Sequence, residues 1–341
     1  MHRVMFCSKS DEAASTRYRA LQLLPLLAER GWEAEHRVAG KTARQRVALL
    51  RRASEVDAVV VLRRTFTPAM RWAIRRAARR LVFDFDDAIY TTAHGSSRSR
   101  GRRFAAILRR CDEVWAGNET LAEAACGRRA NVRVHPTCLD PHPYLDDDSA
   151  SGIGSDADSH VGVTLVWIGS SSTRPYLEGL LPALGEAAKH VDKLKLKVVA
   201  DFAPHAEGPL EIEPVAWSSE VEAPALRSSD VGLAPLPDDP WTRGKCGFKV
   251  LQYMAAGLPV IASPVGVQTE LVTENETGLH ADTDAAWIDG VHRLASDPTK
   301  RAAMGLAGRR AMLERYTMHH AADRVARALD GLCEGDVGAV R

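Results

Sequence analysis

The chain has 341 residues, of which 45% are hydrophobic and 26% are charged, as in a typical soluble globular protein. It contains no apolar run that approaches the length of a membrane-spanning helix, and its N-terminus lacks the apolar core of a signal peptide. The six cysteines lack C-x-x-C spacing, so neither a zinc site nor a disulfide framework is predicted. We therefore expect a cytoplasmic protein with two α/β domains.

The net charge of +1 conceals an asymmetry. Through Pro136 the chain has 27 Lys and Arg against 14 Asp and Glu, whereas the remainder has 18 against 30. A basic half predicts an anionic partner, either an anionic acceptor molecule or the inner surface of a membrane. Nucleic acid is disfavoured, because no aromatic stacking set accompanies the arginines.

The first half reads as alternating strands and helices. The loop after the first strand (4–6) faces the ligand cleft in a doubly wound sheet, so Arg17 and Arg19 are candidates to bind an acceptor or donor phosphates. The alternative is that both arginines are solvated or pair with Asp11 and Glu12. Pro25 predicts a kink in the helix that follows the loop.

A later strand, 81–87, ends in acids. Carboxylates at the carboxyl end of a parallel strand point into the cleft, where Asp86 and Asp87 would orient or deprotonate an acceptor hydroxyl. Asp84 is expected to support the strand turn. The next segment, 95–110, reads as a mobile basic loop and a short amphipathic helix, which would lie on an anionic membrane, clamp an anionic acceptor, or remain a solvated surface loop.

The stretch 244–266, GKCGFKVLQYMAAGLPVIASPVG, predicts a loop, a helix and a buried strand. Lys245 and Lys249 flank the helix N-terminus, where the helix dipole is already positive, and a bound phosphate would resolve that conflict. The amides near Gly247 and Phe248 would bind the same phosphate, and Gln252 would reach a sugar hydroxyl. The alternative is a surface helix with two solvated lysines.

This stretch resembles the donor-binding core of retaining glycosyltransferases of family 4, and the resemblance extends from about Trp167 to Val272. It implies a GT-B fold, in which two Rossmann-like domains with parallel sheets face each other across a cleft. The family pattern has two glutamates, and Gly244 and Gln252 stand at their positions. The expected domains are an acceptor domain (1–140), a flexible linker (141–160), a donor domain (161–315) and a C-terminal helix (316–341) that crosses back to the first domain.

The resemblance implies a retaining transfer of sugar from a nucleotide-diphosphate sugar, without a metal or other cofactor. The alternatives are a degenerate GT-B scaffold that binds nucleotide, and a nucleotide-sugar epimerase. The expected donor-binding residues are Gly169, Ser170, Arg174, Trp217, Lys245, Gly247, Phe248, Lys249 and Gln252. The expected catalytic residues are Lys245, Lys249, Asp86 and Asp87, and the expected acceptor-binding residues are Arg17, Arg19 and Asn118.

Overall fold

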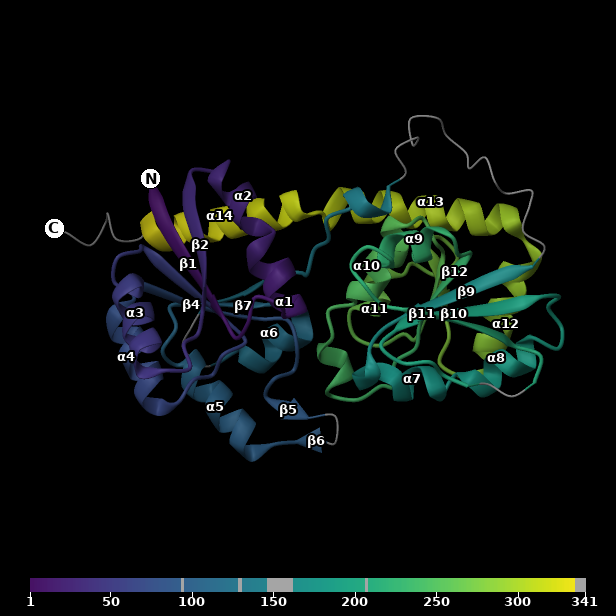
Figure 1. Ribbon diagram of the computed structural model, residues 1–341, viewed down its shortest axis with the longest axis horizontal. Helices are drawn as coiled ribbons and strands as arrows, with labels where there is room; N and C mark the ends of the chain where they lie inside the picture. Colours follow the sequence, from purple (N-terminus) through teal and green to yellow (C-terminus); the bar gives the residue numbers. More distant parts are fainter. Residues whose placement is uncertain (93–94, 128–130, 146–161, 206–207, 335–341) are drawn as a thin grey trace. The chain divides into compact units, whose positions relative to one another are not determined.

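A computed structural model describes residues 1–92, 95–127, 131–145, 162–205 and 208–334 (Figure 1). These residues pack as two compact units. Unit 1 consists of the described parts of 1–138, 239–246 and 318–341, and unit 2 of those of 139–238 and 247–317. Most of the expected linker, residues 146–160, lies outside the described residues.

Unit 1 is built on a parallel sheet. Its strands are β1 (His2–Ser8), β2 (Trp32–Val38), β3 (Ala58–Leu62), β4 (Arg80–Phe85), β7 (Glu113–Ala116) and β8 (Asn131–Val134), in the order β2-β1-β3-β4-β7-β8. The strand order reverses between β1 and β3, which makes the carboxyl ends of these two strands a topological switch point. The central strand β3 is buried along its whole length, as expected for a strand covered on both faces.

The edge strand β2 has no counterpart in the sequence prediction. Its sequence, WEAEHRV, is rich in charge, and only Trp32 among its seven residues is buried. An edge strand pairs on one side only, here with β1, and it tolerates polar residues that a central strand would bury. The apolar pattern that revealed the other strands is therefore weak in this one.

The helical region after β1 also differs from the expected kinked helix. It consists of α1 (Ala14–Thr16), a π-helical turn η1 (Arg17–Leu21) and α2 (Leu23–Ala28). Pro25 lies in the first turn of α2, where a missing backbone N–H breaks no helical hydrogen bond. The irregular part of this helical region is therefore the π-helical turn at 17–21, which precedes Pro25.

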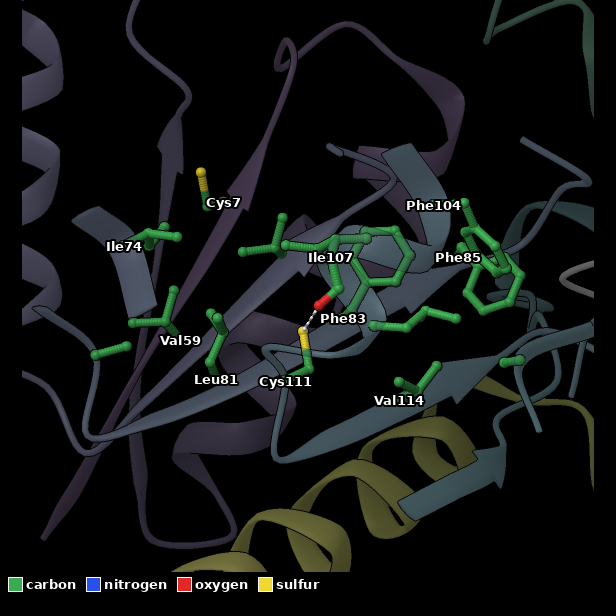
Figure 2. Close-up of a cluster of buried hydrophobic side chains, with 14 of the residues drawn as sticks. Cys7, Val59, Ile74, Leu81, Phe83, Phe85, Phe104, Ile107, Cys111 and Val114 are labelled. Carbon is green, nitrogen blue, oxygen red and sulfur yellow. Dashed lines mark hydrogen bonds between the residues drawn. The ribbon is translucent and has the colours of Figure 1, made fainter. Parts of the chain in front are cut away.

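The remaining helices of unit 1 are α3 (Ala43–Ala53), α4 (Pro68–Ala77), α5 (Arg98–Leu108), α6 (Glu119–Ala125) and α14 (Met318–Glu334). One face of the sheet packs against α3, α4 and α5 in a single apolar cluster. Figure 2 shows Ile74 from α4 and Phe104 and Ile107 from α5 packed over Phe83 and the neighbouring strands. These three helices form one layer of the unit.

The basic segment 95–110 is more ordered than predicted. A short hairpin of β5 (Thr91–Thr92) and β6 (Gly95–Ser96) leads directly into α5, so four of the six arginines of this segment lie on a helix. Its apolar residues Phe104, Ile107 and Leu108 are buried in the core of unit 1. The prediction of a mobile loop is wrong, and the apolar side of this helix is not available to enter a membrane.

The last helix, α14, packs on unit 1 next to α2. Trp32 Nε1 donates a 2.9 Å hydrogen bond to Asp330, and Arg30 forms a 2.6 Å ion pair with Asp323. The chain passes from unit 2 to unit 1 between Thr317 and Met318.

Residues 239–246, which include the short helix η4 (Thr242–Gly244), pack with unit 1. The sequence analysis placed them inside a continuous donor domain of 161–315. In the structure these eight residues pack against α6 and the β4–β5 loop of unit 1, as described below.

Unit 2 contains the second parallel sheet. Its strands are β9 (Val163–Ile168), β10 (Leu194–Ala200), β11 (Glu211–Ala216), β12 (Val231–Ala234), β13 (Val260–Ala262) and β14 (Gly278–His280), in the order β11-β10-β9-β12-β13-β14. This is the strand order of the Rossmann fold, with its switch point between β9 and β12. The expected fold class, two Rossmann-like parallel-sheet units, is confirmed.

The helices of unit 2 cover this sheet. They are η2 (His142–Tyr144), η3 (Ser171–Thr173), α7 (Arg174–Glu178), α8 (Leu181–Ala187), α9 (Glu222–Arg227), α10 (Phe248–Ala255), α11 (Gln268–Leu271), α12 (Asp284–Ser296) and α13 (Pro298–Arg315). Trp167 and Trp287 are buried in one apolar cluster with residues of α7 and α8.

Candidate functional site

The N-terminus of α10 depends on Gly247. This glycine has φ of +63°, a left-handed conformation that strains any residue with a side chain. A Cβ at this position would also lie 2.5 Å from Leu271 Cδ1 and 2.9 Å from Val267 Cγ1. Glycine has no side chain, so residue 247 does not cap the backbone N–H groups in the first turn of α10. Backbone N–H groups at a helix N-terminus are suited to binding an anion.

Lys249 lies in that first turn. Its Nζ is 4.4 Å from the centroid of the Trp167 ring, close enough for a cation–π interaction that orients the ammonium group. Trp167 belongs to β9 and is fully buried. Gly169 allows this arrangement, because a Cβ there would lie 2.2 Å from Trp167 Cη2. Gly169 and Lys249 therefore both contact the ring of Trp167.

Arg174 lies on the same aromatic group. Its guanidinium carbon is 5.3 Å from the Phe202 ring centroid, and Phe202 meets Trp167 edge to face at 5.9 Å. The side chain of Arg174 also forms an ion pair with Glu178. In the loop between β9 and α7, Ser170 and Thr173 form a capping box at the start of η3. Two cations and a hydroxyl-rich turn therefore gather at the carboxyl end of β9.

Gln252 lies elsewhere. It is only 3% exposed, and its amide nitrogen donates a 3.1 Å hydrogen bond to the Tyr144 hydroxyl. Tyr144 in turn donates to the Glu222 carboxylate, which also accepts a 2.8 Å hydrogen bond from Trp217 Nε1. In this structure Gln252 contacts Tyr144 where we expected a ligand hydroxyl. Trp217 remains 49% exposed, with its ring position fixed through Glu222.

Lys245 belongs to unit 1, whereas Lys249 belongs to unit 2. The Lys245 Nζ lies 5.5 Å from the Trp241 ring centroid. Asn118 holds the Lys245 backbone, since its amide donates a 3.0 Å hydrogen bond to the Lys245 carbonyl oxygen while its oxygen caps α6 at Leu121.

Gly244, at the position of the first family glutamate, has no room for a side chain. A Cβ there would lie 2.7 Å from Ala88 Cβ and 3.1 Å from Leu121 Cδ2. Two residues later, the Cys246 thiol donates to the Asp86 carbonyl oxygen. Burial raises the pKa of Cys246 to about 12, so the thiol is not activated by Lys245. The lost glutamate thus coincides with the close packing of this segment on unit 1.

The acids after β4 share one cation, Arg63. Its guanidinium lies 2.9 Å from Asp87 Oδ2 and 3.4 Å from Asp86 Oδ1. Burial raises the pKa of Asp87, although Arg63 and Lys245 oppose that shift. Arg63 itself has a left-handed φ of +54°, an uncommon conformation for a residue with a side chain, which often marks a functional site.

Arg19 is buried among protein groups. Its guanidinium forks onto Asp84, with Nε 2.8 Å from Oδ2, and donates 3.0 Å to the His135 carbonyl oxygen. Burial lowers the pKa of Arg19, but the adjacent Asp84 carboxylate outweighs burial and keeps it charged. Arg19 is only 7% exposed, and its guanidinium contacts groups of unit 1 where we expected an acceptor. Arg17 is half-buried and lies over the Tyr18 ring.

The sequence patterns did not identify three side chains that contact the expected site residues: Arg63, Tyr144 and Glu222. Arg63 directly follows a central strand at the switch point of unit 1, and that position was a usable signal. Tyr144 and Glu222 are 78 residues apart in sequence and meet only in the folded unit, so no local pattern marks them.

Within the described residues, no group of three or more His, Cys, Asp or Glu side chains is arranged to hold a metal ion. The described helices likewise include none with both the length and the apolar character to cross a membrane. All six cysteines are free thiols.

Residues 162–297 match the family model of glycosyl transferases group 1. The chain is 37% identical over 87 residues to a GDP-mannose-dependent alpha-(1-6)-phosphatidylinositol monomannoside mannosyltransferase of Mycolicibacterium smegmatis, covering 25% of this chain and 23% of the relative. It is 30% identical over 141 residues to a D-inositol 3-phosphate glycosyltransferase of Pseudarthrobacter chlorophenolicus, covering 39% and 30%. The chain thus matches less than a third of the length of these relatives.

Solved structures extend the likeness to nearly the whole chain. Anabaena HepE in complex with UDP and glucose superimposes with a TM-score of 0.71 at 14% sequence identity, covering 97% of this chain and all of HepE. At this identity the comparison shows the fold alone. The fold of this chain is accordingly GT-B, and the segment 162–297 is the part that resembles group 1 glycosyltransferases in sequence.

Proposed function

We propose that the protein is a retaining glycosyltransferase that moves a sugar from a nucleotide-diphosphate sugar to an acceptor, without a metal or other cofactor, in the cytoplasm. The match of 162–297 to glycosyl transferases group 1 supports the reaction class. The two curated relatives are both glycosyltransferases by name, and HepE binds UDP and glucose. In this proposal unit 2 binds the donor and unit 1 binds the acceptor.

The observation that carries the proposal is the arrangement at the start of α10. Lys249 lies over Trp167 in the first turn of a helix that begins at a left-handed glycine. The helix dipole, the backbone amides and the ammonium group all favour negative charge at this point. A diphosphate has the charge and the oxygen atoms to use them together. Arg174 would assist from the end of β9.

The proposed chemistry is electrostatic. The acceptor hydroxyl oxygen forms a bond to the anomeric carbon on the face from which the diphosphate departs, and the carbon–oxygen bond to the diphosphate breaks. The departing diphosphate takes the acceptor proton, so atoms and charge balance without a separate base. Lys249 stabilises the negative charge of the leaving group, and Asp86 and Asp87 orient the acceptor hydroxyl.

We propose an anionic acceptor. The names of the two relatives describe a phosphatidylinositol monomannoside and an inositol 3-phosphate as their substrates, and both contain a phosphorylated cyclitol. In unit 1 the candidates for phosphate binding are Arg63, at the switch point, and Arg17. Arg63 already neutralises Asp86 and Asp87, so the binding of a phosphate would redistribute charge within this cluster.

A second function deserves a test because of Gly244. The absence of space for an acid at this position favours a protein that binds nucleotide sugar without transferring the sugar. The two functions share the donor site and differ only in turnover.

The first experiment is calorimetric titration of the protein with UDP, GDP, ADP and dTDP, together with the variant Lys249→Ala and the matched control Lys189→Ala on the surface of unit 2. We expect one nucleotide to bind, and the loss of one charge-assisted contact to weaken it by about tenfold or more. Equal binding by both variants would refute the donor site. The matching nucleotide sugars are then tested for transfer, with and without EDTA, and NMR of the product reports the anomeric configuration.

A further inference from the structure

The helices α3, α4 and α5 of unit 1 (Figure 1) are strongly cationic in sequence. The three helices contain four, three and four arginines and not one aspartate or glutamate. Apolar residues of all three helices, including Leu49, Ile74 and Phe104, pack inward on the sheet, and most of the arginines lie on the exposed side. Most of them are exposed: Arg44, Arg46, Arg51, Arg76, Arg98, Arg100, Arg102 and Arg103. We call this set the arginine layer.

Arg51, Arg52 and Arg75 pair with acids of unit 1, but other arginines lie close enough to repel one another. Burial and the neighbouring charges of Arg110, Arg103 and Arg109 lower the pKa of Arg71. Arg71 is 8% exposed and donates hydrogen bonds of 2.9 and 2.7 Å to the carbonyl oxygens of Thr65 and Phe66, so it is fixed inside the cluster. Crowded like charges destabilise a fold unless an anionic partner neutralises them.

Two large apolar side chains are exposed in the same layer. Trp72 on α4 is 59% exposed, and Val47 on α3 is 66% exposed. Helical spacing places Trp72 beside Arg76, and Val47 between Arg44 and Arg51. Exposed tryptophan among arginines is typical of proteins that lie at the interface of a lipid bilayer, where the indole ring enters the headgroup region and the cations contact lipid phosphates.

From these observations we infer that the arginine layer docks on an anionic lipid membrane. The membrane provides phosphate for the arginines and an apolar boundary for Trp72 and Val47, whereas a soluble polyanion provides only the first. The proposal differs from the expected role of 95–110, because the apolar residues of α5 are part of the core and the apolar contact comes from α3 and α4. Docking requires no transfer reaction, so it stands or falls independently of the proposed function.

The test is co-sedimentation of the full chain with vesicles of phosphatidylcholine alone and with vesicles that also contain phosphatidylglycerol. We expect binding only to the anionic vesicles and a loss of binding as salt is raised. The variant Arg44→Glu, Arg102→Glu, Arg103→Glu should bind about tenfold more weakly or worse, since each cation near an anionic surface contributes on the order of 1 kcal/mol. The matched control, Lys189→Glu, Lys193→Glu, Arg310→Glu, reverses three exposed charges of unit 2 and should bind like the wild type.

Trp72→Ser separates a membrane from other polyanions. It should weaken binding to anionic vesicles and leave binding to a single-stranded oligonucleotide unchanged. Equal sedimentation with neutral and anionic vesicles would overturn the proposal, as would wild-type binding by the triple variant of the arginine layer. Binding to the oligonucleotide without binding to vesicles would also overturn it. Thermal unfolding of each variant verifies that the fold is intact.

Discussion

The carboxyl ends of the two sheets use charge in different ways. In unit 1, Asp84 in β4, and Asp86 and Asp87 directly after it, form ion pairs with Arg19 and Arg63. In unit 2, β9 is followed by glycine, three serines, a threonine and Arg174, and Lys249 and Arg174 lie over aromatic rings. In unit 1, carboxylates neutralise the two arginines within the protein. In unit 2, two positively charged side chains and several hydroxyl groups lie together at the end of β9.

This difference shows why position at a strand end is not sufficient to identify a ligand contact. Arg17 and Arg19 are two residues apart on the same π-helical turn, yet Arg19 is fixed by a buried carboxylate and Arg17 is half-buried over a tyrosine ring. The burial and the partners of each arginine depend on the whole unit, and they indicate a structural role for Arg19.

The largest effect that separates the two arginines should be on stability. Arg19→Ala leaves Asp84 buried without its cation and should lower the free energy of unfolding of unit 1 by about 3–5 kcal/mol. Arg17→Ala should change it by less than about 0.5 kcal/mol, because its side chain is partly exposed. Urea denaturation followed by circular dichroism measures both. A similar loss in the two variants would contradict the structural role given to Arg19.

A smaller effect is expected at Gly244. Restoring the family acid with Gly244→Glu forces a side chain against Ala88 and Leu121, and overpacking of this kind costs about 1–3 kcal/mol. We expect a lower thermal midpoint and no gain in nucleotide affinity. Gln252→Glu, which keeps the size of the side chain at the second family position, is the matched comparison. If Gly244→Glu keeps the wild-type midpoint, the close packing of residues 239–246 is incorrect.

The smallest effect concerns pH. Burial, together with Arg19, Arg324 and Arg133, lowers the pKa of His135 to about 3 from an ordinary 6.5. His135 therefore binds a proton near pH 6.5 in the unfolded chain but only near pH 3 in the folded chain. The free energy of unfolding consequently falls as the pH is lowered through this window. By pH 5.5 the loss from this residue is about 1.4 kcal/mol.

The variant His135→Phe tests this account, because it keeps a ring to stack on Trp115, 4.7 Å from His135 in the wild type, and removes the titration. The stability of the variant should decline less than that of the wild type between pH 7 and pH 5.5. Parallel declines would mean that His135 is protonated in the folded state.

Much of the architecture followed from the sequence alone. The apolar runs at 58–62 and 260–262 predicted β3 and β13 with the bounds that the structure gives, because strands buried on both faces need continuous apolar residues. Gly247, Gly257 and Pro259 similarly delimited α10. These signals are local, and each one corresponds to a physical requirement of a single element.

The tertiary structure decided what no local pattern could. It placed 239–246 on unit 1, so that Lys245 and Lys249 belong to different units, and it paired Arg19 with Asp84 across 65 residues. It also joined Gln252 to Glu222 through Tyr144 and buried the apolar side of α5. The physical reason is common to all four: side-chain partners and burial are set by contacts between distant segments, whereas propensity and periodicity describe one segment at a time.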